Sequence, residues 1–166
     1  IIREMGTVDL LTGLLNRNCY QKNLLNYPNM QFESLACVYC DVNGLHELNN
    51  SQGHEAGDEM LREVALTIRN YFGDTHSYRI GGDEFCVILE KTNAVEIHQI
   101  LDSLERKINV YNEKNNIKIS YAKGCEISTR EHYYLMEELT KRADSRMYEN
   151  KRLMKGKRLD GRRLNV

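Results

Sequence analysis

One segment in the first third of the chain constrains the fold more than any other. Residues Leu35 to Val42 (LACVYCDV) are apolar apart from Asp41, and neither glycine nor proline interrupts them. A continuous apolar run of this length is typical of a central strand that is buried on both faces. The segment therefore predicts a sheet with helices on both sides, and it places one aspartate at the end of a buried strand.

The other patterns indicate helices, a hairpin and one further strand. Apolar residues at helical spacing predict helices over Thr12–Leu25, Gly57–Phe72, Ala94–Tyr111 and Tyr133–Met154, the last with Leu135, Leu139, Ala143 and Met147 facing inward. Tyr78–Ile80 and Phe85–Leu89 are expected to form a hairpin, in which Gly81-Gly82 makes a tight turn with positive φ. Alternation over residues 117–122 predicts a half-exposed strand. Because strands and helices interleave without a linker, we expect one domain, residues 1–166, of the α/β or α+β class.

Composition excludes several classes of protein. The 166 residues include 23 basic and 24 acidic side chains, and 41% are hydrophobic, which is typical of a folded soluble domain rather than a disordered chain. No run approaches the roughly 18 apolar residues of a membrane span, so we do not expect a membrane-inserted domain. The last 26 residues carry 10 basic and 3 acidic side chains, which suggests contact with an anion. Few aromatic residues accompany these charges, so nucleic acid is not the expected partner.

Five scattered cysteines do not form a recognisable metal site. Cys37 and Cys40 have the spacing of half a zinc motif, but three residues along a strand place their thiols on opposite faces, and no second pair follows. We therefore expect reduced, buried packing cysteines and a cytoplasmic protein. Because the sequence begins without a methionine, we also expect it to be the C-terminal part of a longer protein.

Acidic residues gather at two places. Asp41 ends the buried strand, where an unpaired carboxylate is costly, and Asp83 and Glu84 follow Gly81-Gly82 at the hairpin. If the hairpin pairs beside the strand that ends at Asp41, the carboxylates converge and need a cation, with Mg²⁺ or Mn²⁺ favoured by oxygen ligands. Two interpretations compete with this one: the hairpin acids are merely solvated, or Asp41 caps the helix that follows it.

Four blocks, in order and in register, resemble one family. Tyr78–Phe85 (YRIGGDEF) is similar to the signature that names the GGDEF family, the bacterial diguanylate cyclases. Three further blocks agree with it, namely Asp9–Arg17 (DLLTGLLNR), Asp41–Asp58 (DVNGLHELNNSQGHEAGD) and Arg142–Lys151 (RADSRMYENK). Together the blocks cover residues 9 to about 158, and the resemblance implies a central, mainly antiparallel sheet flanked by helices, related to nucleotidyl cyclase and polymerase palm domains.

The resemblance implies a nucleotidyltransferase that condenses two GTP molecules into cyclic di-GMP and releases pyrophosphate. By position, Asp41, Asp83 and the backbone carbonyl of Val42 match the metal ligands for Mg²⁺ or Mn²⁺. Asp83 and Glu84 match the acidic pair to which deprotonation of the attacking 3′-hydroxyl is assigned, with Asp83 preferred. The remaining substrate-binding positions are Asn49, His54 and Asp58 around the nucleotide, Gly81 and Gly82 beside the phosphates, and Lys151 and Lys155 at the triphosphate.

Several positions depart from the family pattern. Asn43 stands where many members have an aspartate, His46 replaces a usual lysine, and Asn50 replaces an aspartate. An inhibitory Arg-x-x-Asp site that many members carry corresponds here to Phe72–Thr75 (FGDT), without the arginine or the aspartate at its place. We therefore expect no product inhibition through that site.

Two functions follow from these observations. In the first, the chain is an active cyclase that works as a homodimer, since each subunit holds one GTP, and an upstream sensory domain controls the encounter. In the second, it is a catalytically weak or inactive module that binds GTP and regulates a partner domain, as the changes at His46 and Asn50 suggest. The intact Asp41 and Gly81–Glu84 favour the enzyme.

Overall fold

The computed structural model describes residues 6–27 and 33–164. Its elements in chain order are α2 (Arg17–Asn26), β1 (Ser34–Val42), α3 (Leu45–Gln52), α4 (His54–Phe72), β2 (Ser77–Arg79), β3 (Glu84–Glu90), α5 (Ala94–Lys114), β4 (Tyr121–Thr129) and α6 (Met136–Leu164). The strands form one sheet in the order β2-β3-β1-β4, and each neighbouring pair is antiparallel. The expected class, an antiparallel sheet flanked by helices, is confirmed.

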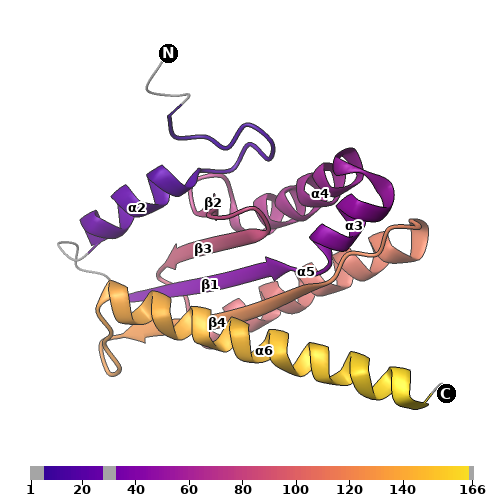
Figure 1. The fold of residues 1–166 in the computed structure, drawn as a ribbon. Coiled ribbons are helices and arrows are strands. Elements are labelled where there is room, and N and C mark those ends of the chain that lie inside the picture. The colour runs from indigo at the N-terminus through magenta and orange to yellow at the C-terminus, as the bar shows by residue number, and fades with distance from the viewer. Residues whose placement is uncertain (1–5, 28–32, 165–166) are drawn as a thin grey trace.

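The central strand is β1, as the apolar run predicted. Every residue from Leu35 to Val42 is buried, because helices cover both faces of the sheet (Figure 1). On one face of the sheet, Val38 and the alternate β1 residues that point the same way form a core with residues of α4 and α5, such as Leu61 and Leu101. On the other face, Cys37 and Tyr39 pack with residues of α2 and α6, such as Tyr20 and Leu139.

The cysteines lie where the strand geometry predicts. Cys37 belongs to the core beneath α2 and α6, and Cys40 belongs to the core beneath α4 and α5, so the two thiols face opposite ways. All five cysteines are free thiols. Burial raises the pKa of Cys40 to about 12, which keeps this thiol protonated and unreactive at neutral pH.

Several predicted elements have different boundaries in the structure, and the start of the first helix and the start of the last strand show the physical reason. The first helix begins at Arg17 rather than Thr12, because Asn16 caps it and Gly13 turns the chain just before it with φ +74°. The last strand begins at Tyr121 rather than at residue 117. In the preceding segment, the Asn112 side chain bonds both the N–H and the C=O of Ile119, at 2.7 and 2.8 Å, and so holds this residue against α5.

The hairpin is present, but its turn differs from the expected one. Neither Gly81 nor Gly82 has positive φ among the described glycines. The loop from Ile80 to Asp83 is longer than a two-residue turn, and it closes where the Ile80 amide donates to the Glu84 carbonyl oxygen at 3.0 Å. A wider loop does not need left-handed backbone, so neither glycine is required here for its φ.

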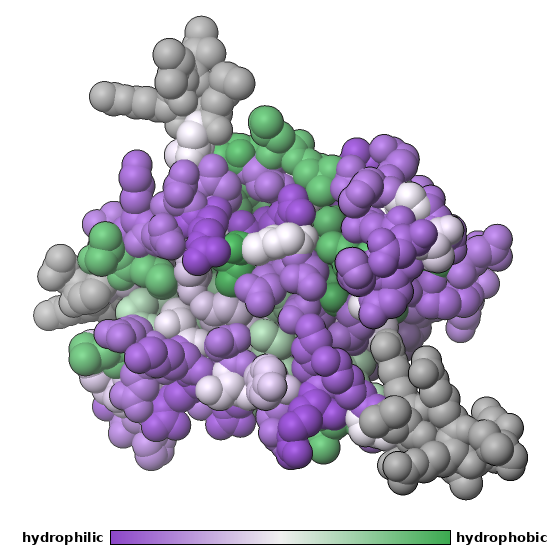
Figure 2. Space-filling model, in the orientation of Figure 1, coloured by the Kyte–Doolittle hydropathy of each residue, from purple (hydrophilic) through white to green (hydrophobic). Residues whose placement is uncertain are grey.

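The long helix α6 lies across the face of β1 and β4 (Figure 1). Leu139, Ala143 and Met147 are buried as predicted, but Leu135 precedes the helix and is 61% exposed. The surface on this side of the molecule is mostly hydrophilic (Figure 2). Within residues 6–27 and 33–164, no helix combines the length and apolar character that a bilayer crossing requires.

Candidate metal and nucleotide site

Three carboxylates meet where β1 ends and β3 begins. The strand register places Asp41 directly opposite Glu84, and Asp83 precedes Glu84 in the hairpin loop. One oxygen from each of the three carboxylates lies within 4.8 Å of the others. Like charges directly across a sheet destabilise it, so this arrangement calls for a cation.

Burial makes the repulsion among these groups stronger. Asp41 is only 6% exposed, and its Oδ1 atom is buried without a hydrogen-bond partner. Burial, followed by the Asp41 carboxylate, raises the pKa of Asp83 above its ordinary 3.8. The same two causes raise the pKa of Glu84 above 4.5, with Asp83 adding to them. An orphaned buried oxygen within a set of carboxylates fits a hard divalent cation such as Mg²⁺ or Mn²⁺.

The two competing interpretations of the acids do not fit this geometry. Asp41 does not cap the next helix, because α3 has Gly44 at its N-cap and no side-chain cap bond. Asp83 and Glu84 are half-buried, and the Asp41 carboxylate helps to raise the pKa of both, so they are not simply solvated turn residues.

Backbone bonds fix the loop that carries Asp83. The Val42 amide donates to the Asp83 carbonyl oxygen at 2.8 Å, which ties the end of β1 to the loop. Gly82 is exposed, and an added Cβ there would meet nothing within 4 Å. An approaching ligand therefore has access to the Gly82 backbone.

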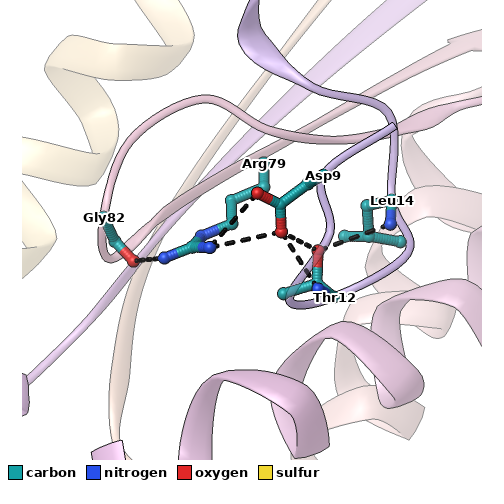
Figure 3. A network of polar contacts seen from close by, with 5 residues as sticks. All are labelled: Asp9, Thr12, Leu14, Arg79 and Gly82. Atoms are coloured by element: carbon teal, nitrogen blue, oxygen red, sulfur yellow. Dashed lines mark hydrogen bonds and ion pairs between the residues drawn. The ribbon is translucent and has the colours of Figure 1, made fainter. Parts of the chain in front are cut away.

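A polar network joins this loop to the N-terminal turn of the domain (Figure 3). Arg79 donates to the Gly82 carbonyl oxygen at 2.8 Å and pairs with Asp9 at 3.2 Å. Partial burial acts to raise the pKa of Asp9, but hydrogen bonds from Thr12 and the Arg79 guanidinium outweigh it and hold the pKa below 3.8. The sequence analysis assigned no role to Asp9 or Arg79, although both lie in the motifs that resemble the family. In the structure, their contacts position the hairpin loop.

A pocket of about 420 Å³ opens beside the carboxylates. Its lining includes Asp41 and Glu84 from the sheet and Asp144, Tyr148, Lys151 and Lys155 from α6. The two lysines differ in their contacts: Lys151 Nζ lies 2.7 Å from Asp41 Oδ2, whereas Lys155 is exposed and forms no ion pair within the described part of the chain. Asp144 and Tyr148 were not among the expected site residues. Their spacing of four along one helix face is the signal that could have added them.

The residues expected around the nucleotide base lie on α3 and α4. Asn49 is in α3, and its Oδ1 atom is buried without a partner. His54 is the first residue of α4, and Asp58 follows it by four residues, so the two share a helix face. Gly57 allows the close packing of α3 on α4, because a Cβ there would overlap Asn49 Oδ1.

The departures from the family pattern have structural counterparts. His46 and Asn50 are four residues apart on α3, and the Asn50 amide lies 3.1 Å from His46 Nε2, so the two changes form one exposed pair. The Asn43 side chain donates to Ser120 Oγ at 2.9 Å. At 72–75, Phe72 is buried and Asp74 pairs with Arg69 at 2.6 Å.

Comparison with known proteins decides the family. The profile of the family described as "Diguanylate cyclase, GGDEF domain" matches residues 6–157. The chain belongs to the GGDEF domain family. This GGDEF domain is 31% identical, over 86% of its length, to diguanylate cyclase DgcS of Shewanella oneidensis, and it covers 49% of that protein. It is 34% identical, over 86% of its length, to the cyclic di-GMP phosphodiesterase PdeB of the same organism, of which it covers 17%.

A solved structure shows the same fold. The GGDEF domain of DgcB from Caulobacter crescentus, crystallised with c-di-GMP, superposes with a TM-score of 0.77 at 23% identity, over 88% of this chain and 90% of that one. This GGDEF domain spans less than half of the length of PdeB and DgcS. Its relatives include both a diguanylate cyclase and a cyclic di-GMP phosphodiesterase. The choice between these two activities depends on the carboxylate site.

Glu84→Gln is expected to stabilise the GGDEF domain in EDTA near neutral pH. A carboxyl whose pKa is raised on folding holds its proton more tightly in the folded state, so stability falls as pH rises from 4.5 through the raised value. Glutamine has no titratable carboxyl, so Glu84→Gln removes this loss of stability. Thermal denaturation at about pH 7 and about pH 4.5 checks this prediction. The variant should be more stable than the wild type at the higher pH only. Glu90→Gln, at the exposed end of the same strand, is the control, and a less stable Glu84→Gln at neutral pH would contradict the account.

Proposed function

We propose that this GGDEF domain is a diguanylate cyclase, which joins two GTP molecules into cyclic di-GMP and releases two pyrophosphates. The observation that carries the proposal is the convergence of Asp41, Asp83 and Glu84 beside a pocket that contains lysines. Relatives named diguanylate cyclase support it. A phosphodiesterase assignment gains nothing from the match to PdeB, because the chain covers only 17% of that protein.

The residues divide the chemistry among them. Asp83 accepts the proton of a ribose 3′-hydroxyl as the general base. The 3′-oxygen then forms a bond to the α-phosphorus of the second GTP, and the bond from that phosphorus to pyrophosphate breaks. Asp41, Asp83 and the Val42 carbonyl would hold Mg²⁺ or Mn²⁺, which supplies positive charge where the phosphates gather negative charge.

Nucleotide recognition is assigned to three sets of residues. Asn49 and Asp58 hydrogen-bond the guanine edge, with His54 beside them on α4. The Asp58 carboxylate accepts from the paired N–H donors of guanine, which adenine does not offer. Lys155 meets the triphosphate, and Gly81 and Gly82 let it approach the backbone of the hairpin loop. Other basic side chains of α6 are engaged already: Lys141, Arg142 and Arg152 pair with glutamates of the same helix.

Catalysis requires a second copy of the chain. One centre holds one GTP, and the product contains two guanylate units, so a homodimer must bring two centres face to face. An upstream sensory domain would control this encounter. The rate is therefore expected to rise more steeply than in proportion to protein concentration until the dimer forms.

Product formation tests the proposal. The domain, fused to a dimerising coiled coil, is incubated with GTP and Mg²⁺ or Mn²⁺, and the nucleotides are separated by chromatography. Cyclic di-GMP is the expected product, and it should be absent when ATP replaces GTP. Calorimetric binding of GTP without product at any protein concentration would reject the enzyme and leave a nucleotide-binding regulatory module.

Gly57→Ala is expected to lower the affinity for GTP about tenfold, the equivalent of one lost hydrogen bond. The added methyl group would displace the Asn49 side chain, while alanine in a helix interior offsets part of the cost in stability. Isothermal titration calorimetry measures the effect. Asn49→Ala should show a similar loss, and the double variant should lose little more than either single one. Full additivity of the two losses would show that Gly57 does not act through Asn49.

A further inference from the structure

The two lysines of the pocket have different electrostatic surroundings. Lys151 Nζ contacts Asp41 Oδ2 at 2.7 Å, and the two side chains are only 25% and 9% exposed. Lys155 is four residues further along α6, lines the same pocket, and forms no ion pair with the side chains described within 6–27 and 33–157. The resemblance assigned both lysines to the triphosphate, yet only Lys155 has an ammonium group that is free to bind it.

Lys151 carries the compensating charge of the carboxylate centre. Among the described salt bridges, it forms the single one made by Asp41, Asp83 or Glu84. Three carboxylates within 4.8 Å of one another and one ammonium leave an excess of negative charge. A divalent cation neutralises more of that charge than an ammonium group can.

We propose that Lys151 is the counter-cation of the metal-free centre, and that a divalent cation displaces its ammonium group from Asp41 into the adjoining pocket. This inference rests on the metal site of the proposed function. A cation bound to Asp41 at the roughly 2.1 Å usual for Mg²⁺ lies within a few ångströms of the present Nζ position. At that separation the two positive charges repel each other strongly, because the surroundings are partly buried.

The pocket gives the displaced group a place to go. The lysine side chain is a flexible four-carbon stem, and the space of about 420 Å³ that borders Asp41 extends along α6 to Lys155. Metal binding thus adds a second ammonium group to the surface that meets phosphate. Because coupling of binding is reciprocal, a polyphosphate raises the affinity for the metal by the same factor.

Metal affinity without nucleotide tests the inference independently of turnover. Mn²⁺ is titrated calorimetrically into the intact chain and into Lys151→Met. Removing the competing ammonium group is expected to tighten Mn²⁺ binding about tenfold, or about 1.4 kcal/mol. Lys155→Met removes the same charge from the same pocket without an Asp41 contact, and its affinity should stay within about twofold of the wild type. Unchanged or weaker binding by Lys151→Met would overturn the inference and indicate that Lys151 instead orients Asp41.

Two further variants separate the possible failures. Lys151→Gln removes the charge but keeps a hydrogen-bond donor for Asp41. If Lys151→Met does not fold, Lys151→Gln should show the same tightening of Mn²⁺ binding. Asp41→Asn tests the metal site itself: it should abolish the Mn²⁺ binding that the wild type shows. If the wild type and every lysine variant bind no Mn²⁺, both the inference and the metal centre fail. If all of them bind it equally, the inference alone fails.

Discussion

Asp83→Asn is expected to lower the rate of cyclic di-GMP formation by at least about a hundredfold, the usual range for loss of a general base. Asparagine has nearly the same shape as aspartate, so the hairpin loop should keep its position, which the Val42 amide and the Arg79 side chain fix through the backbone. The amide cannot accept the proton of the 3′-hydroxyl, and it weakens the set of carboxylate ligands. Initial rates measured by chromatography at saturating GTP give the effect.

A matched control uses the same chemical change elsewhere. Asp102 is exposed on α5, on the face of the sheet opposite the carboxylates, so Asp102→Asn should keep the wild-type rate within about twofold. GTP affinity of Asp83→Asn should fall far less than its rate. A rate for Asp83→Asn above about a tenth of the wild-type rate would show that Asp83 is not the base.

Gly124→Ala is expected to destabilise the domain by about 3 kcal/mol, or roughly 6–12 °C in Tm for a domain of this size. Gly124 lies in β4 beneath α6, and a Cβ there would overlap the Ala143 carbonyl oxygen and the Met147 amide nitrogen. These are backbone atoms, so the clash cannot be relieved by turning a side chain. The helix must move away from the sheet, and Lys151 moves with it.

Gly156→Ala makes the same substitution on α6, and it is expected to raise the stability of the domain. Beyond its own helix backbone, a Cβ at Gly156 would meet nothing within 4 Å in the described part of the chain, and alanine favours a helix interior over glycine by about 0.5–1 kcal/mol. Thermal or urea denaturation of the two variants should therefore move in opposite directions. A Gly124→Ala variant as stable as the wild type would mean that α6 does not pack this closely on β4.

Much of the fold follows from sequence periodicity. The central strand and the helices α4, α5 and α6 were predicted because each buries a face or a run of apolar residues. Two of the boundaries that failed depend on polar side chains: Asn16 begins α2, and Asn112 holds Ile119 away from the strand that the alternation at 117–122 predicted. Such local side-chain bonds compete with regular structure and leave no periodic signal.

The meeting of Asp41 with the two hairpin acids was predictable from the sequence, but the other contacts of these carboxylates were not. The strand order places the hairpin beside β1 and so brings Asp41 near Asp83 and Glu84, as expected for an aspartate at the end of a buried strand. The register that sets Asp41 opposite Glu84 joins two strands between which α3, α4 and β2 intervene, so no local turn specifies it. The contact between Lys151 and Asp41 joins residues 110 positions apart, and the position of α6 over Gly124 determines it. No local pattern assigns that lysine to a carboxylate rather than to phosphate.

The most direct test of the carboxylate centre is a crystal structure of the domain with Mn²⁺ and a non-hydrolysable GTP analogue, read by anomalous scattering. The account predicts an Mn²⁺ peak within bonding distance of carboxylate oxygens of Asp41 and Asp83, with Lys151 Nζ moved from its 2.7 Å contact with Asp41 toward the phosphates. A bound nucleotide whose Mn²⁺ lies elsewhere, with the Lys151–Asp41 pair intact, would contradict it.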